Sequence, residues 1–283
     1  MNQKGPNKVL LNGFPWVLEV FVISNLAFLA VDIFLAHSVN RFFHPAEWIP
    51  FWFSAVSPLF LVTACLRGPR DSSGRGRVGI LVGSLAIVVG ISGFILHLEA
   101  AFFSEQTLKS LVYTAPFAAP LAYAGLGMLL LVNRLERDAP LAWSQWVVFL
   151  ALGGFVGNLA LSLCDHAQNG FFIASEWIPV VAAAFGVSFL TVLLFRSAEP
   201  ALQDACIGLM CLESIVGILG FFLHGKGDLA DLNGNLWFHF VHGAPIFAPL
   251  LFSNLAILAI LGIVGLRIFS RECSPDEPIP DSD

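Results

Sequence analysis

The chain has 283 residues, of which 57% are hydrophobic and only 12% are charged. Soluble globular domains carry about a quarter charged residues, so this composition, with a mean hydropathy of +0.80, excludes a soluble globular protein. The net charge of −6 comes without any basic cluster, which argues against nucleic acid as a partner.

Apolar segments of about 20 residues recur along the chain, and each predicts a transmembrane helix because backbone groups in lipid must satisfy their own hydrogen bonds. The eight expected spans are 14–36, 48–66, 78–96, 111–133, 142–164, 177–195, 205–223 and 241–266. A polar segment, 1–13, precedes them, and an acidic segment, 268–283, is expected to be a disordered tail. The sequence therefore predicts an all-α polytopic integral membrane protein.

The basic residues predict how the chain is oriented in the membrane. Eleven lysines and arginines fall on the side of the two termini, and three fall on the opposite side. Because cytoplasmic loops are enriched in basic residues, we expect both termini in the cytoplasm, as for a protein of the bacterial inner membrane.

One pattern, H-x-x-N-x-F-F-x-x-x-E-W-I-P, occurs twice, at 37–50 and again at 166–179, with eight identities in fourteen positions. Later segments also recur: Gly93-Phe-Ile-Leu-His97 as Gly220-Phe-Phe-Leu-His224, and the proline pair Pro116/Pro120 as Pro245/Pro249. The repetition predicts two tandem four-helix repeats, 14–137 and 138–267. An even number of spans in each gives both the same orientation.

Prolines and glycines carry two further expectations. The proline pairs, early in spans four and eight, should kink those helices or leave backbone carbonyls free. Small residues at helical spacing suit close helix packing, as at Gly79 and Gly83 and at Gly153 and Gly157.

The seven histidines all fall on the predicted non-cytoplasmic side of the membrane. Four of them form two repeat-related pairs, His37 with His166 and His97 with His224. Imidazole is the commonest metal ligand and the usual axial ligand of haem, whereas a single histidine at a helix end is more often an interfacial or capping residue. The five cysteines form no CxxC pair, so no thiolate metal site is predicted.

Two kinds of site remain open. In one, His37, His97, His166 and His224 ligate one or two haems, and the glycines at 90, 93, 217 and 220 leave room for the flat macrocycle. In the other, the same histidines hold copper, iron or zinc. Further candidate ligands for the metal are Glu47 and Glu176, with His239, His242, Asp32 and Asp165 as secondary candidates.

The E-W-I-P element also has a purely structural interpretation. A carboxylate, a tryptophan and a proline in the first turn are typical of a helix start at the membrane interface. Glu47 and Glu176 would then stabilise helix N-termini, or they would complete the site with His37 and His166.

Glu213 lies within span seven, eleven residues before His224, or about 16 Å deeper at 1.5 Å per residue. Its counterpart in the first repeat is Ala86. An unpaired carboxyl near the bilayer midplane should be protonated unless it meets water or a cation. Glu213 is either one step of a proton path or a hydrogen-bonded packing residue.

The leading hypothesis is an integral membrane redox protein, an oxidoreductase or electron carrier, with haem or another metal near its outer face. Its electron-transfer partner would be a lipid-soluble quinone or an extracytoplasmic protein. The alternatives are a transporter or channel for a small solute or metal ion, and a non-catalytic subunit that packs against other membrane chains.

Overall fold

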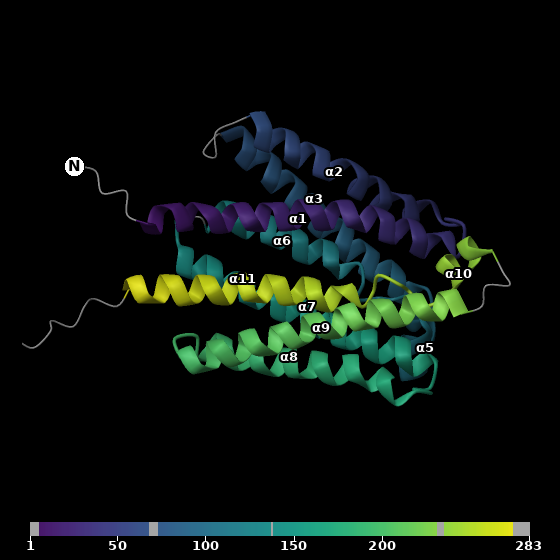
Figure 1. Ribbon diagram of the computed structural model, residues 1–283. Coiled ribbons are helices and arrows are strands. Elements are labelled where there is room, and N and C mark those ends of the chain that lie inside the picture. The colour runs from purple at the N-terminus through teal and green to yellow at the C-terminus, as the bar shows by residue number, and fades with distance from the viewer. Residues whose placement is uncertain (1–5, 68–72, 137, 231–234, 274–283) are drawn as a thin grey trace, which may run out of the picture.

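The computed structural model describes residues 6–67, 73–136, 138–230 and 235–273, and the regular structure in these segments is helical throughout. Within these described segments, seven helices are long and apolar enough to cross a membrane, and an eighth apolar helix is shorter. The long helices lie roughly side by side in one bundle (Figure 1). The protein is therefore a helical integral membrane protein.

The N-terminal half contains four long or medium helices and three short ones. The longer helices are α1 (Pro6–Ser38), α2 (Trp48–Arg67), α3 (Ser73–Glu99) and α6 (Leu121–Leu135). The shorter elements are a 3-10 turn (Pro45–Glu47), α4 (Phe102–Glu105) and α5 (Leu108–Tyr113).

The C-terminal half follows a similar order. Its longer helices are α7 (Pro140–Gln168), α8 (Trp177–Phe195), α9 (Pro200–Ala230) and α11 (Leu250–Cys273). Its short elements are a second 3-10 turn (Ala174–Glu176) and α10 (Leu236–His242). Residues 268–273 therefore continue α11 instead of belonging to the predicted tail, and the remainder of that tail lies outside the described residues.

The fourth and eighth predicted spans are not continuous helices, so these two predictions were wrong. Residues 111–133 divide into α5, a turn and α6, and residues 241–266 divide into α10, a turn and α11. Each turn contains the two prolines, and each following helix begins at the residue after the second proline, Leu121 or Leu250. Proline lacks the N–H that a continuous helix requires, which explains the break.

Helix contacts close two rings of four: α1–α2–α3–α6 and α7–α8–α9–α11. The rings meet where α6 packs on α7 and α1 packs on α11. Between the rings, Nδ2 of Asn25 in α1 donates to the side-chain oxygen Oδ1 of Asn254 in α11 at 3.2 Å. At one end of the bundle, Gln168 Nε2 donates to the Val112 carbonyl at 2.7 Å.

Several glycines bring helices together, though not all those predicted. A Cβ on Gly83 would lie 2.9 Å from the Gly127 carbonyl oxygen, which confirms close packing of α3 on α6. A Cβ added at Gly153 or Gly157 would have no neighbouring atom within 4 Å, so the packing role predicted for this pair was wrong.

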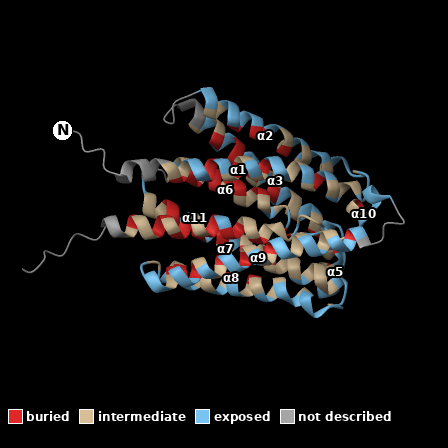
Figure 2. Cartoon of the chain, viewed as in Figure 1, coloured by how far each residue is buried: buried red, intermediate tan, exposed pale blue. Residues whose placement is uncertain are grey.

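The buried side chains gather where the two rings meet, and large apolar side chains cover the outside. Leu18, Leu26, Val147, Phe155 and Ile263 are among the fully buried residues. The outward faces of α2, α8 and α9 are largely exposed (Figure 2), with apolar residues such as Leu59, Phe60 and Ile215. Exposed apolar surface of this extent requires a lipid bilayer around it.

Candidate functional site

The four paired histidines lie at one end of the bundle, here called the histidine end: the end at which α1, α3 and α7 finish. His37, His97 and His166 fall in the last turns of those helices. His224 lies near the end of α9, which runs in the same direction, and α10 with His239 and His242 lies at this end as well (Figure 1). The first turn of α1 and the last turn of α11 lie at the opposite end.

In the N-terminal half, the structure brings His37, His97 and Glu47 together. The imidazole rings of His37 and His97 are 6.1 Å apart between centroids and roughly perpendicular. His37 Nδ1 faces Glu47 Oε2 at 3.5 Å, and the other carboxylate oxygen accepts a hydrogen bond from Asn40 Nδ2 at 2.8 Å. The loop amide thus positions the carboxylate beside the imidazole.

The proline turn before α6 holds His97. His97 Nδ1 lies 2.9 Å from the Pro116 carbonyl oxygen, and Thr114 Oγ1 donates to the His97 carbonyl at 2.5 Å. Of the two outcomes expected from these prolines, the kink appears as a complete break between α5 and α6. The Pro116 carbonyl is not free, because it accepts a hydrogen bond from the Ala119 N–H at 3.2 Å as well as facing His97 Nδ1.

The C-terminal half repeats part of this arrangement. His224 Nδ1 lies 3.0 Å from the carbonyl oxygen of Pro245, the counterpart of Pro116. His166 lies in the last turn of α7 at the same end of the bundle, with its ring centroid 6.1 Å from that of Phe171. The contacts of His37 with His97 and Glu47 have no counterpart among the ion pairs and ring contacts of the described residues. Glu176 Oε2 is buried and has no hydrogen-bond partner within the described part of the chain. Each half therefore places two histidines and one glutamate at the histidine end.

The loop after the first histidine of each half has the same backbone conformation. Phe42 and Phe171 have positive φ values of 51°, and their N–H groups donate to the carbonyls of His37 and His166 at 3.0 and 3.1 Å. This bond ends the helix with a left-handed residue, as helices commonly end. The phenylalanine is the first of the F-F pair in the repeated pattern.

The same phenylalanine stacks on the tryptophan of E-W-I-P. Ring centroids are 4.1 Å apart for Phe42 and Trp48 and 4.0 Å apart for Phe171 and Trp177. Trp48 and Trp177 are the first residues of α2 and α8, which confirms E-W-I-P as a helix start. The repeated pattern therefore encodes a helix–loop–helix turn in both halves, and in the first half this turn holds His37 beside Glu47.

One position of this turn differs between the halves and provides a matched test. Arg41 and Gly170 both have positive φ, 59° and 71°, which is costly for any residue with a Cβ. We expect Arg41→Gly to raise the free energy of unfolding by up to about 1 kcal/mol and Gly170→Arg to lower it by about 1–2 kcal/mol. Denaturant unfolding of the two variants in bicelles measures both, and equal signs for the two changes would contradict the expectation.

The secondary candidates are not joined to the histidine pairs by any interaction seen in the described segments. His242 stacks on Phe238 with centroids 4.3 Å apart, and Asp32 and Asp165 are partly buried on α1 and α7. The Nε2 atom of His239 is buried without a hydrogen-bond partner in the described chain. Within residues 6–67, 73–136, 138–230 and 235–273, no three or more His, Cys, Asp or Glu side chains are grouped to hold a metal ion.

The space predicted for a macrocycle beside the glycines is filled, so this part of the haem hypothesis was wrong. A Cβ on Gly93 would lie 2.8 Å from Pro120 Cβ, and a Cβ on Gly220 would lie 2.7 Å from Pro249 Cβ. These glycines admit the proline turns that present the carbonyls to His97 and His224, which places any flat cofactor away from the α3–α6 and α9–α11 contacts.

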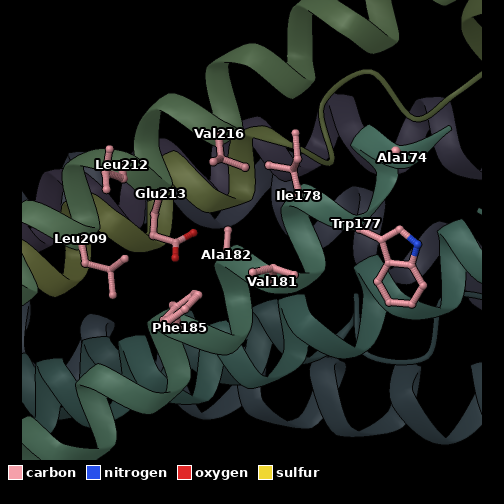
Figure 3. Close-up of a pocket in the computed structure, with 10 residues that line it drawn as sticks. All are labelled: Ala174, Trp177, Ile178, Val181, Ala182, Phe185, Leu209, Leu212, Glu213 and Val216. Carbon is pink, nitrogen blue, oxygen red and sulfur yellow. The ribbon is translucent and has the colours of Figure 1, made fainter.

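Glu213 lines a cavity of about 390 Å³ between α8 and α9. Its side chain points from α9 towards Ala182 and Phe185 of α8, and Trp177 lies at the histidine end of the cavity (Figure 3). Glu213 is 1% exposed, and neither carboxyl oxygen has a hydrogen-bond partner in the described part of the protein.

The sequence reasoning missed a charged cluster at the end opposite the histidines. Glu19 is 1% exposed, and its carboxylate accepts two hydrogen bonds from Arg134, at 2.6 and 2.7 Å. Asn133 Nδ2 donates to the same carboxylate at 3.0 Å, and Trp143 Nε1 donates to the Asn133 side chain at 3.3 Å. The signal that could have found the cluster was an acid near the start of the first predicted span and an arginine directly after the fourth, at the same end of the bundle.

Comparisons with protein-family models, with curated proteins and with solved structures found no match.

Proposed function

We propose that the chain is a tandem duplication of a four-helix unit, and that each unit uses its histidine pair to bind haem or a transition-metal ion for membrane redox chemistry. The two rings of helices and the proline turns of α5–α6 and α10–α11 support the duplication. In the proposed arrangement of two four-helix units, α6, with its 15 residues, is the fourth of the eight membrane spans.

The observation that carries the proposal is the contact between His97 Nδ1 and the Pro116 carbonyl, repeated by His224 and Pro245. A carbonyl oxygen only accepts hydrogen bonds, so Nδ1 carries the proton and Nε2 keeps its lone pair. Metal-ligating histidines nearly always donate their second ring nitrogen to a carbonyl or a carboxylate, which fixes the tautomer and the ring orientation.

His37 has a carboxylate beside it instead of a carbonyl. Its Nδ1 lies 3.5 Å from Glu47 Oε2, an oxygen with no hydrogen-bond partner in the described chain, so Glu47 is proposed both as an orienting group and as a ligand. Two imidazoles on one metal ion, with bonds of about 2.0–2.1 Å, have ring centroids roughly 5–6.5 Å apart. The His37–His97 separation of 6.1 Å falls within that range.

In each half, the two histidines would hold the proposed haem iron, or a copper, iron or zinc ion, through their imidazole nitrogens. Bound haem or redox-active metal would supply one-electron chemistry at the histidine end, which the positive-inside pattern places on the outer face. Electrons would pass to or from a lipid-soluble quinone or an extracytoplasmic protein.

The optical spectrum of the purified protein, with its metal content, tests the proposal. We expect a Soret band that shifts on reduction, or a stoichiometric transition metal, in protein purified from membranes without chelators. The His44→Ala variant is the control for a histidine outside the proposed sites and should keep the Soret band or the metal. His44 lies in the loop before α2 and has no counterpart in the second half. Protein without a Soret band and without bound metal would refute the proposed function.

The broken helices favour one second candidate, a secondary transporter. Transporter sites are often built from discontinuous helices in repeated halves, and the turns between α5 and α6 and between α10 and α11 are breaks of this kind. A transporter would move its solute with no bound redox cofactor.

A further inference from the structure

We propose that the cavity between α8 and α9 binds a membrane-soluble quinone or its quinol, with Glu213 as the hydrogen-bonding partner of the head group. The choice of a quinone rests on the proposed redox function, whereas the existence of a ligand site rests on the cavity and the carboxyl alone.

The cavity has the dimensions and lining of a small-molecule site. Its volume of about 390 Å³ is within the range of roughly 300–1,000 Å³ typical of ligand pockets. Glu213 is the single charged residue among apolar neighbours, which include Ile178, Val181, Phe185, Leu209 and Val216. One polar group in an apolar pocket fixes the orientation of a ligand that is otherwise apolar.

Glu213 lacks a partner that a ligand would supply. Both carboxyl oxygens are buried with no hydrogen bond to the described residues, and the side chain points into the cavity (Figure 3). A buried polar group left unsatisfied costs about 1–3 kcal/mol, and such groups in native proteins call for an explanation. A ligand that hydrogen-bonds to the carboxyl removes this cost.

The walls indicate that the ligand arrives from the bilayer. Leu212, Phe185 and Val181 are 60%, 52% and 49% exposed on the lipid-facing surface, so the cavity opens towards the hydrocarbon. A lipid acyl chain could enter by this route but would leave Glu213 unsatisfied. The ligand is therefore an apolar molecule that carries a hydrogen-bonding group on a compact head.

A carboxyl group suits both redox forms of a quinone. The protonated carboxyl donates to a quinone carbonyl, and a carboxyl oxygen accepts from a quinol hydroxyl. Phe185 and Trp177 provide aromatic surface at the cavity, against which a flat ring packs favourably.

The site belongs to the C-terminal half alone. The counterpart of Glu213 at the 127-residue offset between His97 and His224 is Ala86, which is fully buried and carries no polar group. The expected stoichiometry is one quinone per chain, although each half carries its own histidine pair.

Binding of decylubiquinone to the full chain in nanodiscs tests the proposal. Loss of one charged or strong hydrogen bond costs about 1.5–3 kcal/mol, so Glu213→Leu should weaken binding about tenfold or more. Leu212→Trp should also weaken binding by filling the cavity. Leu219→Trp is its matched control, on an exposed leucine two turns along α9 that does not line the cavity.

Weaker binding in Leu212→Trp with unchanged binding in Leu219→Trp supports the proposal even if Glu213→Leu fails to fold. Wild-type affinity in Leu212→Trp, or in a folded Glu213→Leu protein, would overturn it. So would equal competition by decylbenzene, which lacks carbonyl groups, because the site would then be selective only for an apolar chain.

The assay separates this proposal from the proposed function, because it needs no bound metal or haem. A protein that binds decylubiquinone through Glu213 but contains no metal refutes the redox centre and leaves the cavity assignment in place. A protein that has a Soret band, and whose affinity for decylubiquinone is unchanged by Glu213→Leu, refutes the cavity assignment alone.

Discussion

We expect that replacing both His97 and His224 with alanine yields a protein without the proposed haem or metal, whereas each single variant keeps the proposed cofactor of the other half. Each substitution removes a proposed ligand whose Nε2 is freed by the carbonyl contact of Nδ1. Loss of only an orienting partner lowers metal affinity about 10–100-fold, and loss of a ligand from a two-histidine site should lower it further. Absorbance of the Soret band and metal content per chain measure the effect.

The control for folding is thermal unfolding of each variant, compared with His44→Ala. A folded double variant that retains all its cofactor would show that these histidines are not ligands. If the double variant still accumulates a solute in vesicles at the wild-type rate, with no cofactor in either protein, the transporter candidate is correct.

Glu19→Ala lowers the free energy of unfolding by about 3–5 kcal/mol, because it leaves the Arg134 guanidinium buried without its carboxylate. The Glu19 side chain is wholly buried and that of Arg134 is 11% exposed. Asn133 loses an acceptor in the same step. Unfolding by denaturant in bicelles, followed by intrinsic tryptophan fluorescence, to which Trp143 of the same cluster contributes, measures the change.

A second ion pair of the chain provides the control. Arg196 and Glu199 form an exposed contact at 3.3 Å, and Glu199→Ala should cost less than about 1 kcal/mol. Replacing Glu19 and Arg134 together by apolar residues should restore much of the stability, since no unpaired charge then remains. If Glu19→Ala and Glu199→Ala lowered the free energy of unfolding equally, the expectation that the buried ion pair contributes more than the exposed one would be wrong.

The sequence was sufficient for the helical membrane class and for most helix positions. Long apolar runs leave little freedom in lipid, so six of the eight predicted spans lie in continuous helices. The other two contain the proline pairs that were expected to kink them, Pro116/Pro120 and Pro245/Pro249, and there the helix is broken completely instead of bent. The parallel two-repeat architecture stays a prediction.

The candidate site was predictable where the pattern repeats and unpredictable where it does not. The recurrence of histidine at fixed offsets selected His37 and His97, which the structure places side by side, while their role as ligands remains a prediction. Glu19 and Arg134 are 115 residues apart and occur in the first half alone, so no recurrence marked them. The predicted space for a macrocycle beside Gly93 was wrong because the sequence shows that a side chain is missing there but not that Pro120 fills the space.

The brevity of α6 has a consequence for how the protein sits in the bilayer. Its 15 residues extend about 22 Å at 1.5 Å per residue, whereas the hydrocarbon core is about 30 Å thick. With Arg134 at the cytoplasmic surface, we expect the proline turn before α6 to lie below the opposite headgroups, where irregular backbone is stable only if protein or water covers it. His97 and Thr114 provide such cover through their contacts. A cofactor held there would be shielded from the aqueous phase by the depth of the turn itself.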